Sequence, residues 1–152
     1  MIVSDYIREK FCLMDLKSQD KEEAIKEIAK VFDEGGKILD REKFINDVLE
    51  REDLGSTGIG NNVAIPHART DAVKGFVIGF GKSNAGMEFK SLDGQKVNLI
   101  FLMGASPDEL NLYLRILAEL SKLLMDASFR QDLIAAKTES EVISLIKKFE
   151  KR

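Results

Sequence analysis

The chain has 152 residues, a length that fits one domain, and its 44% hydrophobic residues suffice for a packed core. Its net charge is only −3, from 23 basic and 26 acidic side chains, so bulk charge gives no reason to bind nucleic acid or an anionic membrane. No stretch approaches the roughly 18 consecutive apolar residues of a membrane span, and the first residues do not form a signal peptide pattern. One cysteine and one histidine cannot make an internal disulfide or a zinc cluster. These features predict a cytoplasmic protein with no metal, no other cofactor and no direct membrane insertion.

The first third of the chain predicts a short strand and two helices. Residues 11–16 favour the strand. Asp20 is a candidate N-cap for a helix whose apolar side chains repeat with a period of 3.6, and the glycine pair at 35–36 ends it. A second helix is expected to begin at Asp40 and to stop before Gly55.

The centre and the end of the chain predict a sheet followed by helices. Short runs rich in β-formers occupy residues 63–65, 76–80 and 97–103, and the last run is apolar enough to be buried on both faces. Ser106 is a candidate N-cap for a leucine-rich helix, and Thr138 for a C-terminal amphipathic helix. The order predicts a single α/β domain over residues 1–152, with a mixed central β-sheet covered by helices on both faces.

Chemistry is expected in the segment 51–69, which joins the second helix to the strands. It combines flexible glycines with the hydroxyls of Ser56 and Thr57, two guanidiniums and the imidazole of His67. Glycine lets backbone N–H groups approach a ligand, and the polar side chains supply donors, so the segment predicts an anion site with phosphate as the guest. An ordinary loop between a helix and a strand, with a histidine that has no role, is the competing interpretation.

Known motifs narrow the chemistry. Asn61 and Asn62 stand where a Walker loop requires Lys and Ser or Thr, and the glycine order differs from that of a dinucleotide fingerprint. A hydrolase triad with Ser56 or Thr57 as nucleophile and Asp71 orienting His67 lacks the Gly-x-Ser-x-Gly elbow. An imidazole among phosphate donors could instead accept a phosphoryl group.

Four short motifs carry the most specific pattern of the sequence: Arg51-Glu52, Ser-Thr-Gly-Ile-Gly at 56–60, Ala-Ile-Pro-His at 64–67 and Ser-Leu-Asp-Gly at 91–94. With these motifs the sequence resembles the enzyme IIA domains of the fructose/mannitol type in the bacterial phosphotransferase system. The nitrogen-regulatory enzyme IIA proteins share the pattern. The resemblance extends over nearly the whole chain.

The resemblance implies a phosphohistidine carrier. His67 would accept a phosphoryl group from the histidine-containing phosphocarrier protein and pass it to a cysteine of an enzyme IIB partner, which serves a membrane enzyme IIC. Arg51 would bind phosphoryl oxygens, with Ser56 and Thr57 completing the cradle. The sequence does not identify the sugar or the oligomeric state.

Two positions depart from the family. Tyr113 aligns with a second histidine, and a phenol can donate a hydrogen bond but remains neutral at pH 7. Asn62 replaces a glycine, and Asn tolerates positive φ better than most residues. Three functions therefore stay open: sugar transport, regulation of protein partners through the phosphorylation state of His67, and a non-catalytic binding module.

Overall fold

The computed structural model describes residues 2–151 and is built around a mixed β-sheet with the strand order β1-β5-β6-β3-β2, in which β4 also pairs with β6. The long antiparallel pair of β5 and β6 forms its centre, whereas β1 joins β5 and both β3 and β4 join β6 in parallel. The strands are β1 (Cys12–Leu13), β2 (Gly58–Gly60), β3 (Val63–Ala64), β4 (His67–Arg69), β5 (Phe76–Met87) and β6 (Val97–Ala105).

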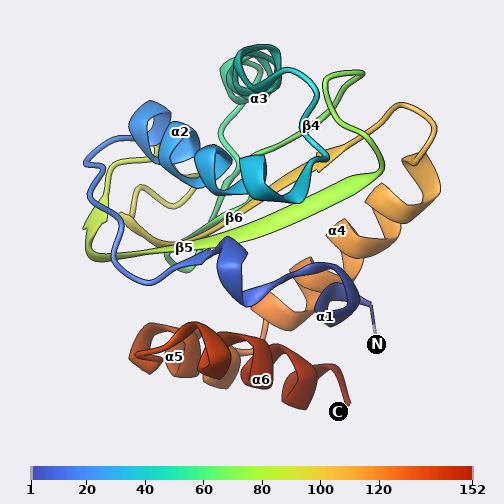
Figure 1. The fold of residues 1–152 in the computed structure, drawn as a ribbon. Coiled ribbons are helices and arrows are strands. Elements are labelled where there is room, and N and C mark those ends of the chain that lie inside the picture. Colours follow the sequence, from blue (N-terminus) through green and yellow to red (C-terminus); the bar gives the residue numbers. More distant parts are fainter. Residues whose placement is uncertain (1, 152) are drawn as a thin grey trace.

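Helices cover both faces of this sheet (Figure 1). On one face lie α2 (Lys21–Val31) and α3 (Arg41–Asp53), with the 3-10 turn η2 (Phe32–Gly35) after α2. On the other face lie α1 (Val3–Tyr6), α4 (Leu110–Leu124), α5 (Ala127–Ala135) and α6 (Glu139–Glu150), and the 3-10 turn η1 (Glu9–Phe11) leads into β1. The predicted fold class is confirmed.

The strand β6 separates two apolar cores. Leu99, Phe101 and Met103 pack with α4, α5 and α6, whereas Ile100 and Leu102 pack with α2 and α3. This alternation follows from the period of two in a strand. The prediction that this run is buried on both faces is therefore confirmed.

The predicted helix starts are confirmed at three positions and wrong at one. The side chains of Asp20, Asp40 and Thr138 each accept a hydrogen bond from the backbone N–H three residues later. Ser106 does not cap α4, which begins at Leu110. The Ser106 hydroxyl hydrogen-bonds the Asp108 carboxylate, and its carbonyl accepts from the Glu109 N–H, so it closes a turn before the helix.

Two loops also differ from or extend the expectations. Of the predicted strand 11–16, only Cys12–Leu13 forms a strand, since Phe11 ends a 3-10 turn. Leu16 still donates a backbone hydrogen bond to Lys82 of β5 at 2.9 Å. The hairpin of β2 and β3 turns through Asn61 and Asn62, whose φ values of 56° and 67° confirm that Asn tolerates the left-handed region there. Within residues 2–151, no helix is both long and apolar enough to cross a membrane.

Candidate functional site

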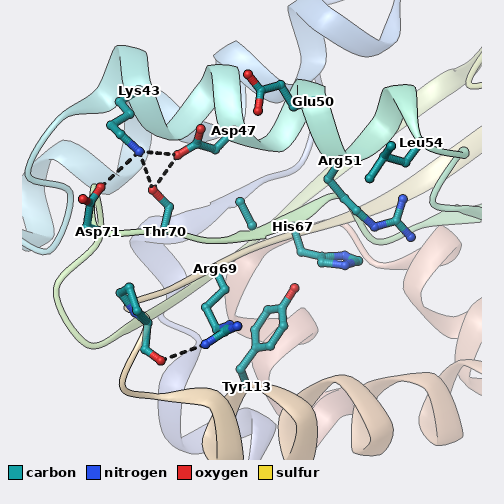
Figure 2. Close-up of a pocket in the computed structure, with 12 residues that line it drawn as sticks. Lys43, Asp47, Glu50, Arg51, Leu54, His67, Arg69, Thr70, Asp71 and Tyr113 are labelled. Carbon is teal, nitrogen blue, oxygen red and sulfur yellow. Dashed lines mark hydrogen bonds and ion pairs between the residues drawn. The ribbon is translucent and has the colours of Figure 1, made fainter.

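An open pocket of about 750 Å³ lies where one side of α3, the strand β4 and the first turn of α4 meet. Three of the five predicted site residues line it, namely Arg51, His67 and Tyr113 (Figure 2). Arg51 and Tyr113 are 62 positions apart in the chain, and the fold brings both of them to the same pocket as His67. The other lining residues are Lys43, Asp47, Glu50, Leu54, Ala68, Arg69, Thr70, Asp71 and Pro107.

His67 begins β4 and is held in one orientation by the backbone. Its Nδ1 lies 2.7 Å from the carbonyl oxygen of Ile65. A carbonyl can only accept, so Nδ1 carries the proton and Nε2 keeps a lone pair. The strand itself is fixed because His67 is paired with Met103 of β6 and the Met103 N–H donates to Pro66. The neutral imidazole therefore has a defined tautomer, in which Nε2 is the nitrogen that could act as a nucleophile.

The surroundings of His67 favour the neutral imidazole. Burial of the half-buried ring lowers its pKa below the ordinary value of 6.5, and the positive charge of Arg51 lowers the pKa further. The hydrogen bond to Ile65 and the negative charge of Glu52 raise the pKa, but they do not reverse the shift. A neutral imidazole at pH 7 is the form that can attack an electrophile.

Arg51 lies in the last turn of α3, and its guanidinium reaches the pocket beside His67 (Figure 2). Nη1 donates to the carbonyl oxygen of Gly55 at 2.8 Å, which anchors the side chain on the loop that follows the helix. The remaining N–H groups of a planar guanidinium suit the oxygens of a phosphoryl group.

Tyr113 projects from α4 toward the imidazole. The two rings meet edge to face with centroids 5.7 Å apart and an interplanar angle of 60°. Burial raises the pKa of Tyr113 to about 12, although the charges of Arg51 and Arg69 oppose the shift. The phenol is therefore protonated at neutral pH and offers its O–H as a hydrogen-bond donor.

Ser56 and Thr57 direct their hydroxyls away from the pocket. The Ser56 hydroxyl donates to the Phe89 carbonyl at 2.7 Å and accepts from the Gly58 N–H at 3.0 Å. The Thr57 hydroxyl and amide both donate to the carboxylate of Glu52. Neither side chain lines the pocket, and both hold the loop that anchors Arg51.

Sequence reasoning missed Glu52 as a buried anchor of this loop. Its side chain is 2% exposed and forms an ion pair with Lys21 of α2, with 2.9 Å between Nζ and Oε1. Lys21 also lies over the ring of Phe89, 4.9 Å from its centroid. Glu52 follows Phe44 and Val48 at intervals of four residues, on the buried face of α3, so a carboxylate at this position was the available signal. Its partner Lys21 lies 31 positions earlier in the chain.

A polar cluster in the same pocket contains Asp71, which the hydrolase alternative would have placed against His67 but which pairs with Lys43 instead. Sequence reasoning gave no role to the other members of this cluster. The ammonium of Lys43 lies 2.8 Å from Asp47 and 3.0 Å from Asp71, and the Thr70 hydroxyl hydrogen-bonds Asp47 at 2.5 Å. This cluster ties α3 to the residues that follow β4. Arg69, the last residue of β4, donates from Nη1 to the Pro107 carbonyl at 2.9 Å.

Curated proteins of two kinds are similar to this chain. The "PTS system fructose-specific EIIABC component" of Bacillus subtilis is 36% identical over 151 residues, which are 99% of this chain and 24% of that protein. The "Nitrogen regulatory protein" of Bradyrhizobium diazoefficiens is 31% identical over 150 residues, covering 96% of this chain and 95% of that protein. The chain thus spans about a quarter of the Bacillus protein and nearly all of the nitrogen regulatory protein.

Solved structures share the fold. The nitrogen regulatory protein IIA-Ntr of Neisseria meningitidis superposes with a TM-score of 0.88 at 26% identity, covering 95% of this chain and 98% of that one. The enzyme IIA for mannitol of Escherichia coli, solved in complex with phosphorylated enzyme IIB, has a TM-score of 0.80 at 22% identity. It covers 93% of this chain and 99% of that one.

A family model identifies the chain more directly. The model described as "Phosphoenolpyruvate-dependent sugar phosphotransferase system, EIIA 2" matches residues 5–149, a span that contains the pocket and all of its lining residues. The chain therefore belongs to the EIIA 2 family of the phosphoenolpyruvate-dependent sugar phosphotransferase system.

Proposed function

We propose that the protein is a phosphohistidine carrier in which His67 receives and releases a phosphoryl group. The observation that carries the proposal is the hydrogen bond from Nδ1 to Ile65, because it leaves the Nε2 lone pair of a neutral imidazole in an open pocket. Membership of the EIIA 2 family supports the same chemistry.

In the first transfer, the phosphoryl donor is the phosphohistidine of the histidine-containing phosphocarrier protein. Nε2 of His67 attacks the phosphorus, the new N–P bond forms, and the N–P bond of the donor breaks with its electron pair returning to the donor imidazole. Positioning and charge stabilisation supply most of the catalysis in such in-line transfers.

In the second transfer, the thiolate of an enzyme IIB cysteine attacks the same phosphorus. An S–P bond forms, the bond to Nε2 of His67 breaks, and the electron pair returns to the imidazole, which is again neutral. The complex of the mannitol enzyme IIA with phosphorylated enzyme IIB supports a partner of this kind. Enzyme IIC takes part only through enzyme IIB.

Arg51 and Tyr113 are the residues that we assign to the phosphoryl group. Arg51 presents a guanidinium beside His67, and Tyr113 presents a neutral O–H from a ring in contact with the imidazole. Ser56 and Thr57 support the site as positioning residues, since their hydroxyls fix the loop whose Gly55 carbonyl holds Arg51.

The proposal is tested by incubating the protein with phosphoenolpyruvate, enzyme I and the histidine-containing phosphocarrier protein. We expect intact mass at alkaline pH to show one acid-labile phosphoryl group on the wild type and none on His67→Ala. Since His67 is the only histidine, the modified side chain is unambiguous. An unmodified wild type would instead favour a non-catalytic binding module.

Fructose-class sugar uptake is the first choice of pathway, because the fructose-specific relative is 36% identical over 99% of the chain. Regulation of protein partners is the second candidate, favoured by the nitrogen regulatory relative that matches over nearly its full length. Transfer from phosphorylated protein to a purified fructose enzyme IIB separates them. Failure of that transfer, together with capture of a kinase or transporter that depends on phosphorylation, would establish the regulatory function.

A further inference from the structure

The cations of the pocket differ in what neutralises them. Lys43 is paired with the carboxylates of Asp47 and Asp71. Within the described range 2–151, neither Arg51 nor Arg69 has a carboxylate oxygen within 4.0 Å of its guanidinium. The pocket therefore contains two guanidiniums that no carboxylate of the described residues contacts, and each has N–H groups available to an anion. Glu50 is the one other acidic side chain among the lining residues besides Asp47 and Asp71.

Each of the two guanidiniums is held in place by one backbone carbonyl of its own. Arg51 donates to the Gly55 carbonyl at 2.8 Å, and Arg69 donates to the Pro107 carbonyl at 2.9 Å. A guanidinium has five N–H donors, so each retains groups for another acceptor. The anchors also give the two side chains defined positions before an anion arrives, which lowers the entropy that binding would otherwise cost.

The strand β4 places Arg69 on the same side as His67, because residues two apart in a strand project to the same face. Pairing of Arg69 with Ala105 of β6 fixes this register. In Figure 2, Arg51 comes from α3 and Arg69 from β4, with His67 and the hydroxyl of Tyr113 between them. The charges of both arginines act on the Tyr113 phenol, whereas Arg51 is the one that acts on His67.

A phosphoryl group on nitrogen carries about two negative charges at neutral pH and three acceptor oxygens. One guanidinium binds two of those oxygens and neutralises one charge. Tyr113 adds a donor but no charge, since it is protonated. A second guanidinium would match the second charge and the remaining oxygen, and Lys43 is already shared by two carboxylates.

We propose that Arg69 is a second phosphoryl-binding residue, which together with Arg51 neutralises the phosphoryl group on His67 from the side of Tyr113. The inference rests on the proposed function and deepens it, because it assigns the charge that the phenol does not supply. The site is then a clamp of two guanidiniums beside His67 and the neutral phenol of Tyr113.

The experiment is a titration with inorganic phosphate, in which the NMR signals of the single histidine report binding at the pocket. Chloride keeps the ionic strength constant, so that general screening is the same at every point. The proteins compared are the wild type, Arg69→Gln, Arg69→Lys and Arg115→Gln. Arg115 is an exposed arginine of α4 that does not line the pocket. Arg115→Gln removes one positive charge, as Arg69→Gln does, and is therefore the matched control.

We expect saturable binding to the wild type and to Arg115→Gln, with affinity lower by about tenfold in Arg69→Gln, the effect of losing one charged hydrogen-bond donor. Arg69→Lys should fall between them, because lysine keeps the charge and loses the planar fork. Unfolding midpoints of all four proteins establish that each is folded.

Equal phosphate affinity for Arg69→Gln and Arg115→Gln would overturn the inference, as would a wild type in which phosphate leaves the His67 signals unchanged. The relay from phosphoenolpyruvate tests the proposed function separately. A wild type that binds phosphate through Arg69 but is never phosphorylated would refute the carrier function and leave the anion clamp standing. If the wild type is phosphorylated but Arg69→Gln does not change the phosphate affinity, the carrier function stands and the role of Arg69 is refuted.

Discussion

Arg51 and Glu52 are neighbours in the last turn of α3, yet their side chains lie in different environments. Arg51 reaches into the open pocket, whereas Glu52 is buried and accepts hydrogen bonds from Thr57 while it pairs with Lys21. The end of the helix is thus tied to the following loop at two points. Glu52 accepts hydrogen bonds from Thr57 of the loop, and the Gly55 carbonyl of the loop accepts a hydrogen bond from Arg51. The position of the guanidinium therefore depends on a carboxylate that does not itself line the pocket.

Replacing Glu52 with Gln should destabilise the protein. The amide still offers an oxygen to Thr57, but Lys21 then loses its counter-charge in a largely buried setting. Removing one partner of a buried ion pair costs up to about 3 to 5 kcal/mol, and partial exposure of Lys21 places the expected loss at about 1 to 3 kcal/mol. Urea unfolding at neutral pH measures it.

A double-mutant cycle with Lys21→Met provides the control for this prediction. If the ion pair is the cause, the double variant should lose less free energy of unfolding than the sum of the two single variants. Additive losses would show that Glu52 and Lys21 do not interact energetically.

The carboxylate of Glu150 should stabilise the packing of the chain's first helix. It accepts hydrogen bonds from the amides of Ile2 and Val3 at 2.9 and 2.8 Å, and from both the amide and the hydroxyl of Ser4. Bonds to a charged acceptor are worth about 1.5 to 3 kcal/mol, so Glu150→Ala should lower the free energy of unfolding by roughly that amount. Urea unfolding at pH 7 measures the loss.

The pH dependence of this loss identifies its cause. Burial acts to raise the pKa of Glu150, but the hydrogen bonds from Ser4, Ile2 and Val3 outweigh it, and the net shift is below the ordinary value of 4.5. A lowered pKa means that the stabilisation is complete above 4.5 and is lost as the pH falls through the folded-state pKa. The difference between wild type and Glu150→Ala should therefore shrink in acid. A difference independent of pH would point to packing alone.

Much of the fold follows from local signals in the sequence. The aspartate and threonine caps and the apolar periods predict α2, α3 and α6, and the run at 97–103 predicts a central strand, because each signal is contained in a few neighbouring residues. Ser106 was misassigned because a capping box and a turn use the same residue types. The helix α5 was not predicted, although Asp126 caps it.

The candidate site was predictable where one segment contains it. His67, Arg51 and the Asn61-Asn62 turn lie within the loop region that the sequence singles out. The destinations of the Ser56 and Thr57 hydroxyls were not predictable, since their acceptors are a carbonyl of residue 89 and a buried carboxylate. Composition shows that donors are present, whereas only the fold decides which way they point.

Removing the hydroxyl of Tyr113 should slow phosphorylation without unfolding the protein. Tyr113→Phe keeps the ring that packs edge to face on His67 and deletes only the donor. The rate of phosphorylation from the phosphocarrier protein should fall by about tenfold, the effect of one hydrogen bond to a charged group. Quench-flow with mass detection measures the rate. A Tyr6→Phe variant on α1, away from the pocket, should leave it unchanged.

The neutral form of His67 should persist to lower pH than that of a free histidine. Burial and the charge of Arg51 lower its pKa below 6.5, so NMR titration of the one histidine should give a midpoint under that value, and Arg51→Gln should raise the midpoint. Because the unfolded chain binds this proton first, His67 contributes its full stability above 6.5 and loses it as the pH falls toward the folded-state pKa. Phosphorylation should be constant above pH 7 and decline as the pH falls through the folded-state pKa, since a protonated Nε2 has no lone pair with which to attack. A midpoint at or above 6.5 would show that the hydrogen bond to Ile65 and the charge of Glu52 outweigh burial.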